Sequence, residues 1–240
     1  MKPRSKTLFA ALLLLAISCK KENTAIQSSG SADESTKQEL LTDMNEPAAQ
    51  EVTIGTQVWM KRNWTGGRYR NGDRIPQVTD PAKWAALTTG AWCWYNNDSA
   101  NGKIYGKLYN WYAVNDPRGL APECWHVPSD VEWTTLSTYL GGQSVAGGKM
   151  KSTGTIEAGT GLWHEPNTGA TNSSGFTGLP GGYRSFFGTF GLIGDSGYWW
   201  SSAENLSNYA WYRYLYYTNG FSNRYYDSKQ NGFSVRCIKN

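Results

Sequence analysis

The sequence predicts a single α+β domain over residues 51–240, because helical and strand patterns occupy separate parts of this range. Two predicted helices lie between residues 105 and 140, whereas the predicted strands lie at the beginning and at the end of the domain. Residues 143–197 lack clear periodicity but contain many aromatic residues, which indicates ordered long loops with short strands. A domain of this length can bury a large core.

Residues 1–18 have the pattern of a signal peptide. Three basic residues within the first six precede an apolar run over residues 7–18. This run is shorter than the roughly 20 helical residues that cross a bilayer, so a transmembrane anchor is not expected. Small residues directly before Cys19 resemble a bacterial lipobox, although Ala16 stands where leucine is commoner. We therefore expect Cys19 to be lipidated; an ordinary signal peptide cut nearby is the alternative.

Residues 19–50 are predicted to be a lipid-anchored flexible tether. They are rich in Ser, Thr, Gln, Glu and Ala and contain no aromatic residue, so they cannot bury enough apolar surface to fold. Together with the signal, this segment predicts an exported lipoprotein of the outer membrane or cell surface, held to the membrane by its lipid alone. The mixed charges after Cys19 leave open whether it faces the periplasm or the outside.

Strand patterns lie at both ends of the domain. Residues 52–60 predict a hairpin, because Gly55-Thr56 separates two short apolar runs. Three C-terminal segments are predicted strands: residues 198–203, 209–218 and 221–226. Asn219-Gly220 between the last two predicts a type I′ turn. Residues 232–239 alternate, with Phe233, Val235 and Cys237 on one face.

The two helices are predicted by different signals. Apolar residues recur with helical spacing from Tyr105 to Ala113, which predicts an amphipathic helix. Ser129 and Glu132 form a capping-box pattern at the start of a second helix, which Gly141-Gly142 ends.

Composition points to recognition through aromatic side chains. The chain contains 12 Trp and 15 Tyr, and its net charge is only +4 with scattered basic residues, so nucleic-acid binding is not expected. Flat aromatic faces stack on sugar rings while neighbouring polar groups bind hydroxyls. If only one face of residues 209–218 packs inward, the other presents a row of aromatics to solvent. For any single aromatic residue, a place in the core is the favoured alternative.

The ligand-binding candidates chosen on this basis are Trp163, Glu165, Asn167, Tyr183, Arg184, Trp200, Tyr212 and Tyr214.

No enzymatic pattern is found. The sequence has no nucleophile elbow, phosphate loop or dinucleotide fingerprint. Asp130 and Glu132 are two residues apart, so they do not face each other on a helix. A catalytic thiol at Cys124 would need a base such as His126, and a buried structural cysteine is the favoured reading. We expect no catalytic residues.

A series of motifs in fixed order resembles one bacterial family over roughly residues 52–240. The motifs are VTIGTQVWMKRNW, YGKLYNWYAV, WHVPSDVEWTTL, AGGKMKSTGT, PNTGATNSSGFTGLPGGYRS, GYWWSSAEN and GFSVRCIKN. They are similar to the Fibrobacter succinogenes major paralogous domain. This resemblance implies an extracytoplasmic module, found in lipoproteins and secreted proteins, of largely unestablished activity.

More distantly, the order of helices, long loops and terminal SVRC strand is similar to the C-type lectin fold and to formylglycine-generating enzymes. The likeness implies a C-type-lectin-like single domain with two helices, a long-loop region and C-terminal antiparallel strands. Formylglycine-generating enzymes use a pair of active cysteines near their end, whereas this chain offers only Cys237 there. That activity is not expected to transfer, since fold alone does not fix function.

Calcium has weak support. Glu165-Pro166-Asn167 matches a short signature of calcium-dependent sugar-binding lectins, and calcium takes oxygen ligands from loops. The Trp-Asn-Asp partner of those lectins is absent, because Trp199-Trp200-Ser201-Ser202 stands in its place. Glu165 and Asn167 are therefore a weak calcium candidate, with a proline-fixed turn as the alternative. No zinc pattern is present, and no other cofactor is expected.

Three cysteines remain for an oxidising compartment once Cys19 is lipidated, so one disulfide with one thiol left over is the simplest expectation. The family resemblance implies a Cys93–Cys237 disulfide, because relatives usually have glycine at the position of Cys124. The partner among the three stays open, since some relatives carry a cysteine at the position of Ala121.

Taken together, the sequence predicts a non-catalytic recognition module of the cell envelope that binds a glycan or another surface polymer through exposed aromatics. A structural or adhesive protein that binds other envelope proteins is the first alternative. A polysaccharide-acting enzyme is the second. The ligand's identity and the oligomeric state are left undetermined.

Overall fold

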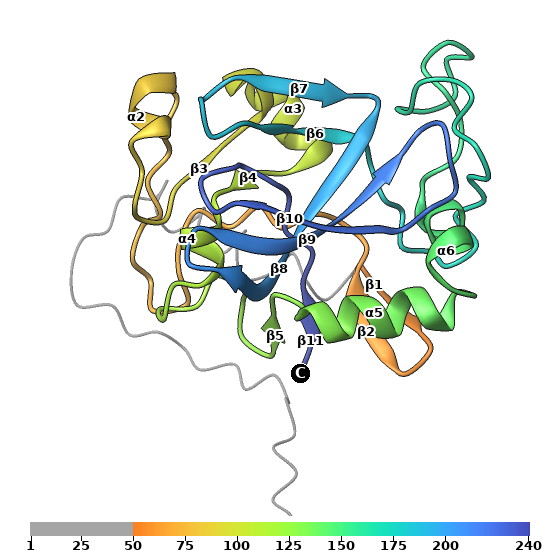
Figure 1. Ribbon diagram of the computed structural model, residues 1–240, viewed down its shortest axis with the longest axis horizontal. Helices are drawn as coiled ribbons and strands as arrows, with labels where there is room; N and C mark the ends of the chain where they lie inside the picture. The colour runs from red at the N-terminus through yellow and green to blue at the C-terminus, as the bar shows by residue number, and fades with distance from the viewer. Residues whose placement is uncertain (1–49) are drawn as a thin grey trace, which may run out of the picture. The chain divides into compact units, whose positions relative to one another are not determined.

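The computed structural model describes residues 50–240, so the predicted signal peptide, Cys19 and nearly all of the predicted tether lie outside the described residues. Figure 1 shows short helices arranged around sheets that the last third of the chain dominates. The described residues are α+β, as predicted. No helix among them is long and apolar enough to cross a membrane.

The helices of residues 50–240 are α2 (Pro81–Ala85), the 3₁₀ helix η2 (Tyr95–Asn97), α3 (Ser99–Tyr105), α4 (Trp111–Val114), α5 (Asp130–Tyr139) and α6 (Gln143–Met150). The strands are β1 (Glu51–Ile54), β2 (Gln57–Met60), β3 (Trp92–Cys93), β4 (Leu108–Tyr109), β5 (Trp125–His126), β6 (Gly181–Arg184), β7 (Phe190–Ile193), β8 (Ser196–Leu206), β9 (Tyr209–Tyr216), β10 (Asn223–Ser228) and β11 (Ile238–Lys239).

The smaller of the two main sheets joins the beginning of the domain to its end. Its strand order is β1-β2-β11-β5, and all pairs are antiparallel. β1 and β2 form the predicted hairpin over residues 52–60. Ile238 in β11 pairs with Trp59 on one side and with His126 on the other. The last strand therefore has to be in place before this sheet is complete.

The larger sheet has the order β10-β9-β8-β6-β7 and carries the candidate site. β8, β9 and β10 form an antiparallel meander, β6 and β7 form a hairpin, and β6 runs parallel to β8. The strands predicted over residues 198–203 and 209–218 are thus confirmed. β10 begins two residues later than predicted.

The connection between β9 and β10 is longer than the predicted type I′ turn. Residues 217–222 form it, and neither Asn219 nor Gly220 has a positive φ. The Asn219 carbonyl accepts a hydrogen bond from Lys151 Nζ (3.0 Å), and the Gly220 carbonyl accepts one from the Gly148 N–H (3.0 Å). These tertiary hydrogen bonds hold the loop against α6 and replace the local turn geometry.

The second predicted helix is confirmed as α5. The Ser129 hydroxyl accepts from the Glu132 N–H (3.2 Å), and the Glu132 carboxylate accepts from the Ser129 N–H (2.7 Å), which completes the capping box. Trp133 and Leu136 on the inner face of α5 are fully buried.

The helix predicted over residues 105–113 is wrong. α3 ends at Tyr105, Gly106 turns the chain with a φ of 80°, and β4 and α4 follow. β4 pairs with β3, and the Tyr109 N–H donates to the Phe233 carbonyl (2.8 Å). The apolar residues of this segment are buried or half-buried, although they belong to three separate short elements. Their spacing in the sequence therefore happened to match that of one face of a helix.

Aromatic side chains fill three clusters of buried residues. The largest surrounds Trp111 and Phe233, the second packs Trp59 against Trp133 of α5 with ring centroids 4.8 Å apart, and the third surrounds Trp84. The C-terminal segment 232–239 contributes to the first two clusters, so both of its faces are buried. The residues of this segment alternate as predicted, but the two sets of side chains enter two different parts of the core. Up to residue 238, neither set faces solvent.

Arg236 is completely buried and has no acidic partner among the described residues. Its guanidinium donates to Asn63 Oδ1 (2.9 Å) and to the carbonyls of Met60 (3.0 Å) and Phe176 (2.6 Å). The Trp199 indole N–H donates to the same Asn63 oxygen (2.8 Å). Burial lowers the pKa of Arg236 to about 9. Only neutral hydrogen-bond acceptors compensate for the burial of this charge, so the loss of any one acceptor would destabilise the fold.

Lys151, directly after α6, is held in a similar way. It is completely buried, and its ammonium group donates to the carbonyls of Thr168 (2.9 Å), Tyr216 (3.1 Å) and Asn219 (3.0 Å). Burial lowers the pKa of Lys151 to about 8. One side chain thus joins α6, the loop before β6 and the β9–β10 connection, which orders the predicted long-loop region.

The predicted Cys93–Cys237 disulfide is wrong, because both residues are free thiols. Cys93 lies in the cluster around Trp84, whereas Cys237 lies in the cluster around Phe233. Burial raises the pKa of each thiol to about 12. Both cysteines therefore serve as small apolar core residues.

Alkylation of the unfolded protein without reductant should modify both Cys93 and Cys237, since neither is cross-linked. In the folded protein both should resist alkylation, because buried thiols with a raised pKa form little thiolate. Peptide mass spectrometry reads both results, with a reduced sample as control. A disulfide-linked peptide containing the two residues would contradict the structure.

Replacing Asn63 with Ala should lower the free energy of unfolding by about 3 kcal/mol, because the buried Arg236 guanidinium loses two charge-assisted acceptor contacts. Urea denaturation measures this loss. Thr65→Ala, at an exposed neighbouring position, is the matched control and should change the free energy by less than about 0.5 kcal/mol. Equal stability of the two variants would contradict the role of Asn63.

The pKa of Lys151 should make the free energy of unfolding depend on pH. Its pKa is about 8 in the folded protein and 10.5 ordinarily, so between these values the unfolded chain binds more protons and stability rises with pH. Relative to Lys151→Met, the wild-type protein should gain about 2 kcal/mol between pH 7 and about pH 9.5.

Denaturation at several pH values tests this dependence, and tyrosine titration is common to both proteins and cancels in the comparison. Lys149→Met, on the neighbouring half-buried position, should keep the wild-type pH profile. A constant difference between wild type and Lys151→Met across this range would contradict the assignment.

Candidate functional site

Three of the predicted ligand-binding side chains belong to the core. Trp163, Arg184 and Trp200 are each 0% exposed, so none offers a surface to a ligand. The Arg184 guanidinium donates to the carbonyls of Val78 (2.6 Å) and Thr79 (2.8 Å), which fixes the segment before α2. The prediction for these three residues is therefore wrong. A core with few Leu, Ile and Val is filled by large aromatic side chains instead.

Glu165 and Asn167 are held in different ways. Glu165 is exposed and accepts from the Thr155 hydroxyl (3.3 Å), whereas Asn167 is buried and its amide donates to the carbonyls of Ser152 and Gly154 (both 3.0 Å). Within residues 50–240, no three His, Cys, Asp or Glu side chains gather as a metal site would require. No cluster of carboxylates therefore surrounds Glu165 and Asn167 in the described part of the chain, and the weak calcium candidate stays a prediction.

The other candidates lie on one face of the larger sheet. Five tyrosines share this face: Tyr183, Tyr198, Tyr212, Tyr214 and Tyr225. They come from four adjacent strands, β6, β8, β9 and β10. In the strand register, Tyr198 is opposite Tyr214, and Tyr212 is opposite Tyr225. We call these five residues the tyrosine ladder.

Neighbouring rings of the tyrosine ladder are in contact. Ring centroids are 5.3 Å apart for Tyr183 and Tyr198, 5.7 Å for Tyr198 and Tyr214, and 6.3 Å for Tyr212 and Tyr225. Tyr225 is 56% exposed, Tyr212 is buried at 6%, and the other three are half-buried. The ladder thus has a buried centre and a partly exposed aromatic surface.

The phenol groups of Tyr198 and Tyr212 remain protonated at neutral pH. Burial raises the pKa of Tyr198 to about 12. Burial, and next the carboxylate of Asp227, raise the pKa of Tyr212 above its ordinary value. A protonated phenol both donates and accepts a hydrogen bond, so the ladder combines apolar ring faces with polar hydroxyl groups.

The arginines of the same strands lie on the opposite face, because successive side chains of a strand alternate. Arg213 and Arg224 both bind Asp130 of α5, at 2.7 and 2.9 Å. Arg224 also lies over the ring of Trp211, 3.4 Å from its centroid. Arg184, next to Tyr183, is buried. The positive charges of these strands are thus directed away from the tyrosine ladder.

β10 is an edge strand that carries two exposed, stacked tyrosine rings. The rings of Tyr225 and Tyr226 are stacked at 5.2 Å with planes 4° apart. Consecutive residues of a strand point to opposite faces, so this stack places both rings near the sheet edge. Rings at the edge hinder pairing with a further strand. This favours a ligand that stacks on aromatics over one that extends the sheet.

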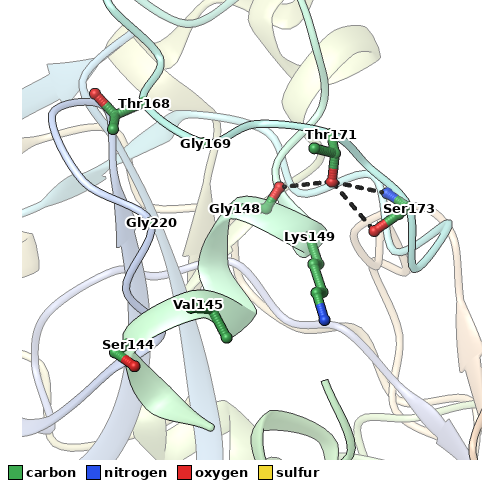
Figure 2. Close-up of a pocket in the computed structure, with 9 residues that line it drawn as sticks. All are labelled: Ser144, Val145, Gly148, Lys149, Thr168, Gly169, Thr171, Ser173 and Gly220. Carbon is green, nitrogen blue, oxygen red and sulfur yellow. Dashed lines mark hydrogen bonds between the residues drawn. The ribbon is translucent and has the colours of Figure 1, made fainter. Parts of the chain in front are cut away.

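A second candidate is an open groove of about 460 Å³ beside α6, shown in Figure 2. Its lining residues are Ser144, Val145, Gly148, Lys149, Thr168, Gly169, Thr171, Ser173 and Gly220. The Thr171 hydroxyl already donates to the Ser173 hydroxyl (3.1 Å). A Cβ on Gly148 would lie 2.4 Å from the Gly169 carbonyl oxygen. Close packing of α6 against the loop that contains Gly169 thus explains the glycine at position 148.

His126, Ser129 and Glu132 lie together but do not form a catalytic triad. The Ser129 hydroxyl donates to the Glu132 carboxylate (2.8 Å), which also lies 2.8 Å from His126 Nε2. In a triad the histidine lies between the nucleophile and the acid, whereas here the carboxylate lies between the other two. Burial opposes ionisation of Glu132, but the hydrogen bonds from Ser129 and His126 outweigh it and lower its pKa. The group caps α5.

The sequence-based candidates missed Tyr198 and Tyr225, which complete the ladder. Each was visible as an aromatic residue in a predicted strand. Their assignment to the same face as Tyr214 and Tyr212 depends on the register between strands. Register shifts interrupt the pairing of β8 with β9 between Trp200 and the connecting loop. The partner of each residue in β8 could therefore not be found by counting residues back from that loop.

Comparison with known proteins assigns the domain to a family. Residues 52–239 match the family model of the Fibrobacter succinogenes major domain, and this range includes the described helices and almost every described strand residue. Searches of curated proteins and of solved structures found no match. The expected likeness to the C-type lectin fold and to formylglycine-generating enzymes stays a prediction. Because its family model covers most of the sequence, the chain belongs to the Fibrobacter succinogenes major domain family.

Proposed function

We propose that this protein is a non-catalytic recognition module that binds a glycan or a related surface polymer on the tyrosine ladder. The observation that carries the proposal is the set of contacting, partly exposed rings on one sheet face. Sugar rings have apolar C–H faces that stack on aromatic rings, while their hydroxyls bind neighbouring polar groups. The protonated phenol of the half-buried Tyr198 supplies such a group.

The rigidity of the ladder supports recognition. Tyr198 stacks on Phe233 of the core, with ring centroids 5.1 Å apart and planes 19° apart. Tyr212 packs on Phe233 from another direction at 4.8 Å. Rings held in this way lose little conformational entropy when a ligand binds, which favours affinity.

The cellular setting of the proposal comes from the sequence alone. Lipidation at Cys19 would anchor the chain to the outer membrane or cell surface, and the tether would let the domain reach surface polymers. Membrane contact would then occur through the lipid only. Metabolic labelling with a radioactive fatty acid, compared between wild type and Cys19→Ser, tests this part separately. Absence of label in both would overturn it.

A second candidate function is adhesion to another envelope protein. The turn between β6 and β7 presents Phe186 and Phe187, which are 37% and 69% exposed and whose ring centroids are 4.0 Å apart. Hydrogen bonds to Asn231 and between Ser185 and Thr189 hold this turn. An exposed apolar pair on a fixed turn is a typical protein contact. Enzymatic action on a polysaccharide has no comparable observation in its favour.

Replacing Tyr225 with Ala should weaken glycan binding at least about tenfold, because a stacking surface is lost from the exposed end of the ladder. Titration calorimetry of the chain without its signal peptide, with glycans selected on an array, measures the affinity. Tyr139→Ala is the matched control, since Tyr139 is 65% exposed on α5, away from the ladder. No binding to any arrayed glycan, or an equal loss in both variants, would overturn the proposal.

A further inference from the structure

The tyrosine ladder runs across the strands rather than along one of them. Going from β6 through β8 and β9 to β10, each strand places at least one tyrosine on the same face. Adjacent strands of a sheet are about 4.8 Å apart. Ring contacts of 5.3 and 5.7 Å lead from β6 through β8 to Tyr214 of β9. A step along β9 to Tyr212 (5.9 Å) then leads to the 6.3 Å contact with Tyr225 of β10, so the contacts between strands are close to the strand spacing. The tyrosines of the ladder are therefore spaced across the sheet, perpendicular to the strands, by the distance between neighbouring strands.

A periodic row of rings fits a ligand with a similar period. In a linear oligosaccharide, sugar rings follow one another at a distance comparable to the spacing of adjacent strands. A single sugar would cover only one or two of the ladder's rings and leave the others solvated. A chain of several sugars can contact the row from Tyr183 to Tyr225.

The charged side chains of these strands favour an uncharged oligosaccharide over an acidic one. The three arginines of these strands all lie away from the ladder face: Arg184 is buried, and Arg213 and Arg224 are bound to Asp130. On the ladder side, the carboxylate of Asp227 is close enough to Tyr212 to favour its protonated form. An acidic polymer would thus meet the Asp227 carboxylate, while none of these three arginines faces it.

We propose that the ligand of the tyrosine ladder is an uncharged linear oligosaccharide of about four or more sugar rings, lying across β6, β8, β9 and β10. This inference rests on the proposed glycan-binding function and adds the length, direction and charge of the ligand. Tyr225 forms the exposed end of the site and Tyr183 the other end.

Calorimetric titration with cello-, xylo- and manno-oligosaccharides of two to six units tests the length. For the series that binds, affinity should rise about threefold to tenfold with each added unit until the ladder is covered, and then become constant. Oligogalacturonides of the same lengths, which are linear but acidic, should bind at least about tenfold more weakly at low ionic strength.

Variants at the two ends locate the chain on the sheet. Tyr225→Ala and Tyr183→Ala should each remove the gain between three and five units, and should lower the affinity for two units much less. Tyr139→Ala, at an exposed position of α5, is the matched control and should leave the whole series unchanged. Circular dichroism checks that each variant keeps its fold.

The outcomes separate this inference from the function on which it rests. If two units bind as tightly as five, or if oligogalacturonides bind as tightly as the neutral chains, the inference is overturned while glycan binding stands. If no oligosaccharide in any series binds and arrayed polysaccharides do not bind either, the proposed function itself is overturned.

Discussion

The buried contact between Asn63 and Arg236 links four segments of the fold. Asn63 Oδ1 accepts from Arg236 and from the Trp199 indole, while the Asn63 amide donates to the Tyr105 carbonyl (2.8 Å) and to the Ser234 hydroxyl (3.1 Å). One side chain therefore joins the end of β2, the end of α3, β8 and the C-terminal segment. A fully buried guanidinium without a carboxylate must keep all of its acceptors, so these segments cannot shift independently without leaving a charge unsolvated.

This constraint also fixes the two faces of the larger sheet. The Trp199 indole donates to Asn63 inside the core, so Tyr198, the preceding residue, must lie on the opposite face of β8. The antiparallel register then places Tyr214 beside Tyr198. The same alternation sends Arg213 and Arg224 towards Asp130 of α5. Separation of rings from charges is thus a consequence of the core. It leaves an aromatic surface with protonated phenols on one side and the ion pairs on the other.

The domain uses aromatic residues both as its core and as its surface, and this double use complicates any assignment of function. Trp163 and Trp200 are fully buried and have the structural role that Leu or Ile has elsewhere. The ladder tyrosines differ because their outer parts reach solvent while Phe233 supports them from inside. The proposed recognition of a glycan by supported, partly exposed rings needs no metal or catalytic group.

Local patterns and ordered motifs were enough to predict the family, the α+β class, the β1–β2 hairpin and the capping box of α5. The sequence also named Tyr183, Tyr212 and Tyr214 as candidates, from their chemistry alone. Three-dimensional contacts were needed to see which aromatics reach solvent, how Tyr198 and Tyr225 join the ladder, and that Cys93 and Cys237 are not bonded to each other. The physical reason is that burial and strand register arise from contacts between residues far apart in the chain, whereas propensity and capping act within a few residues.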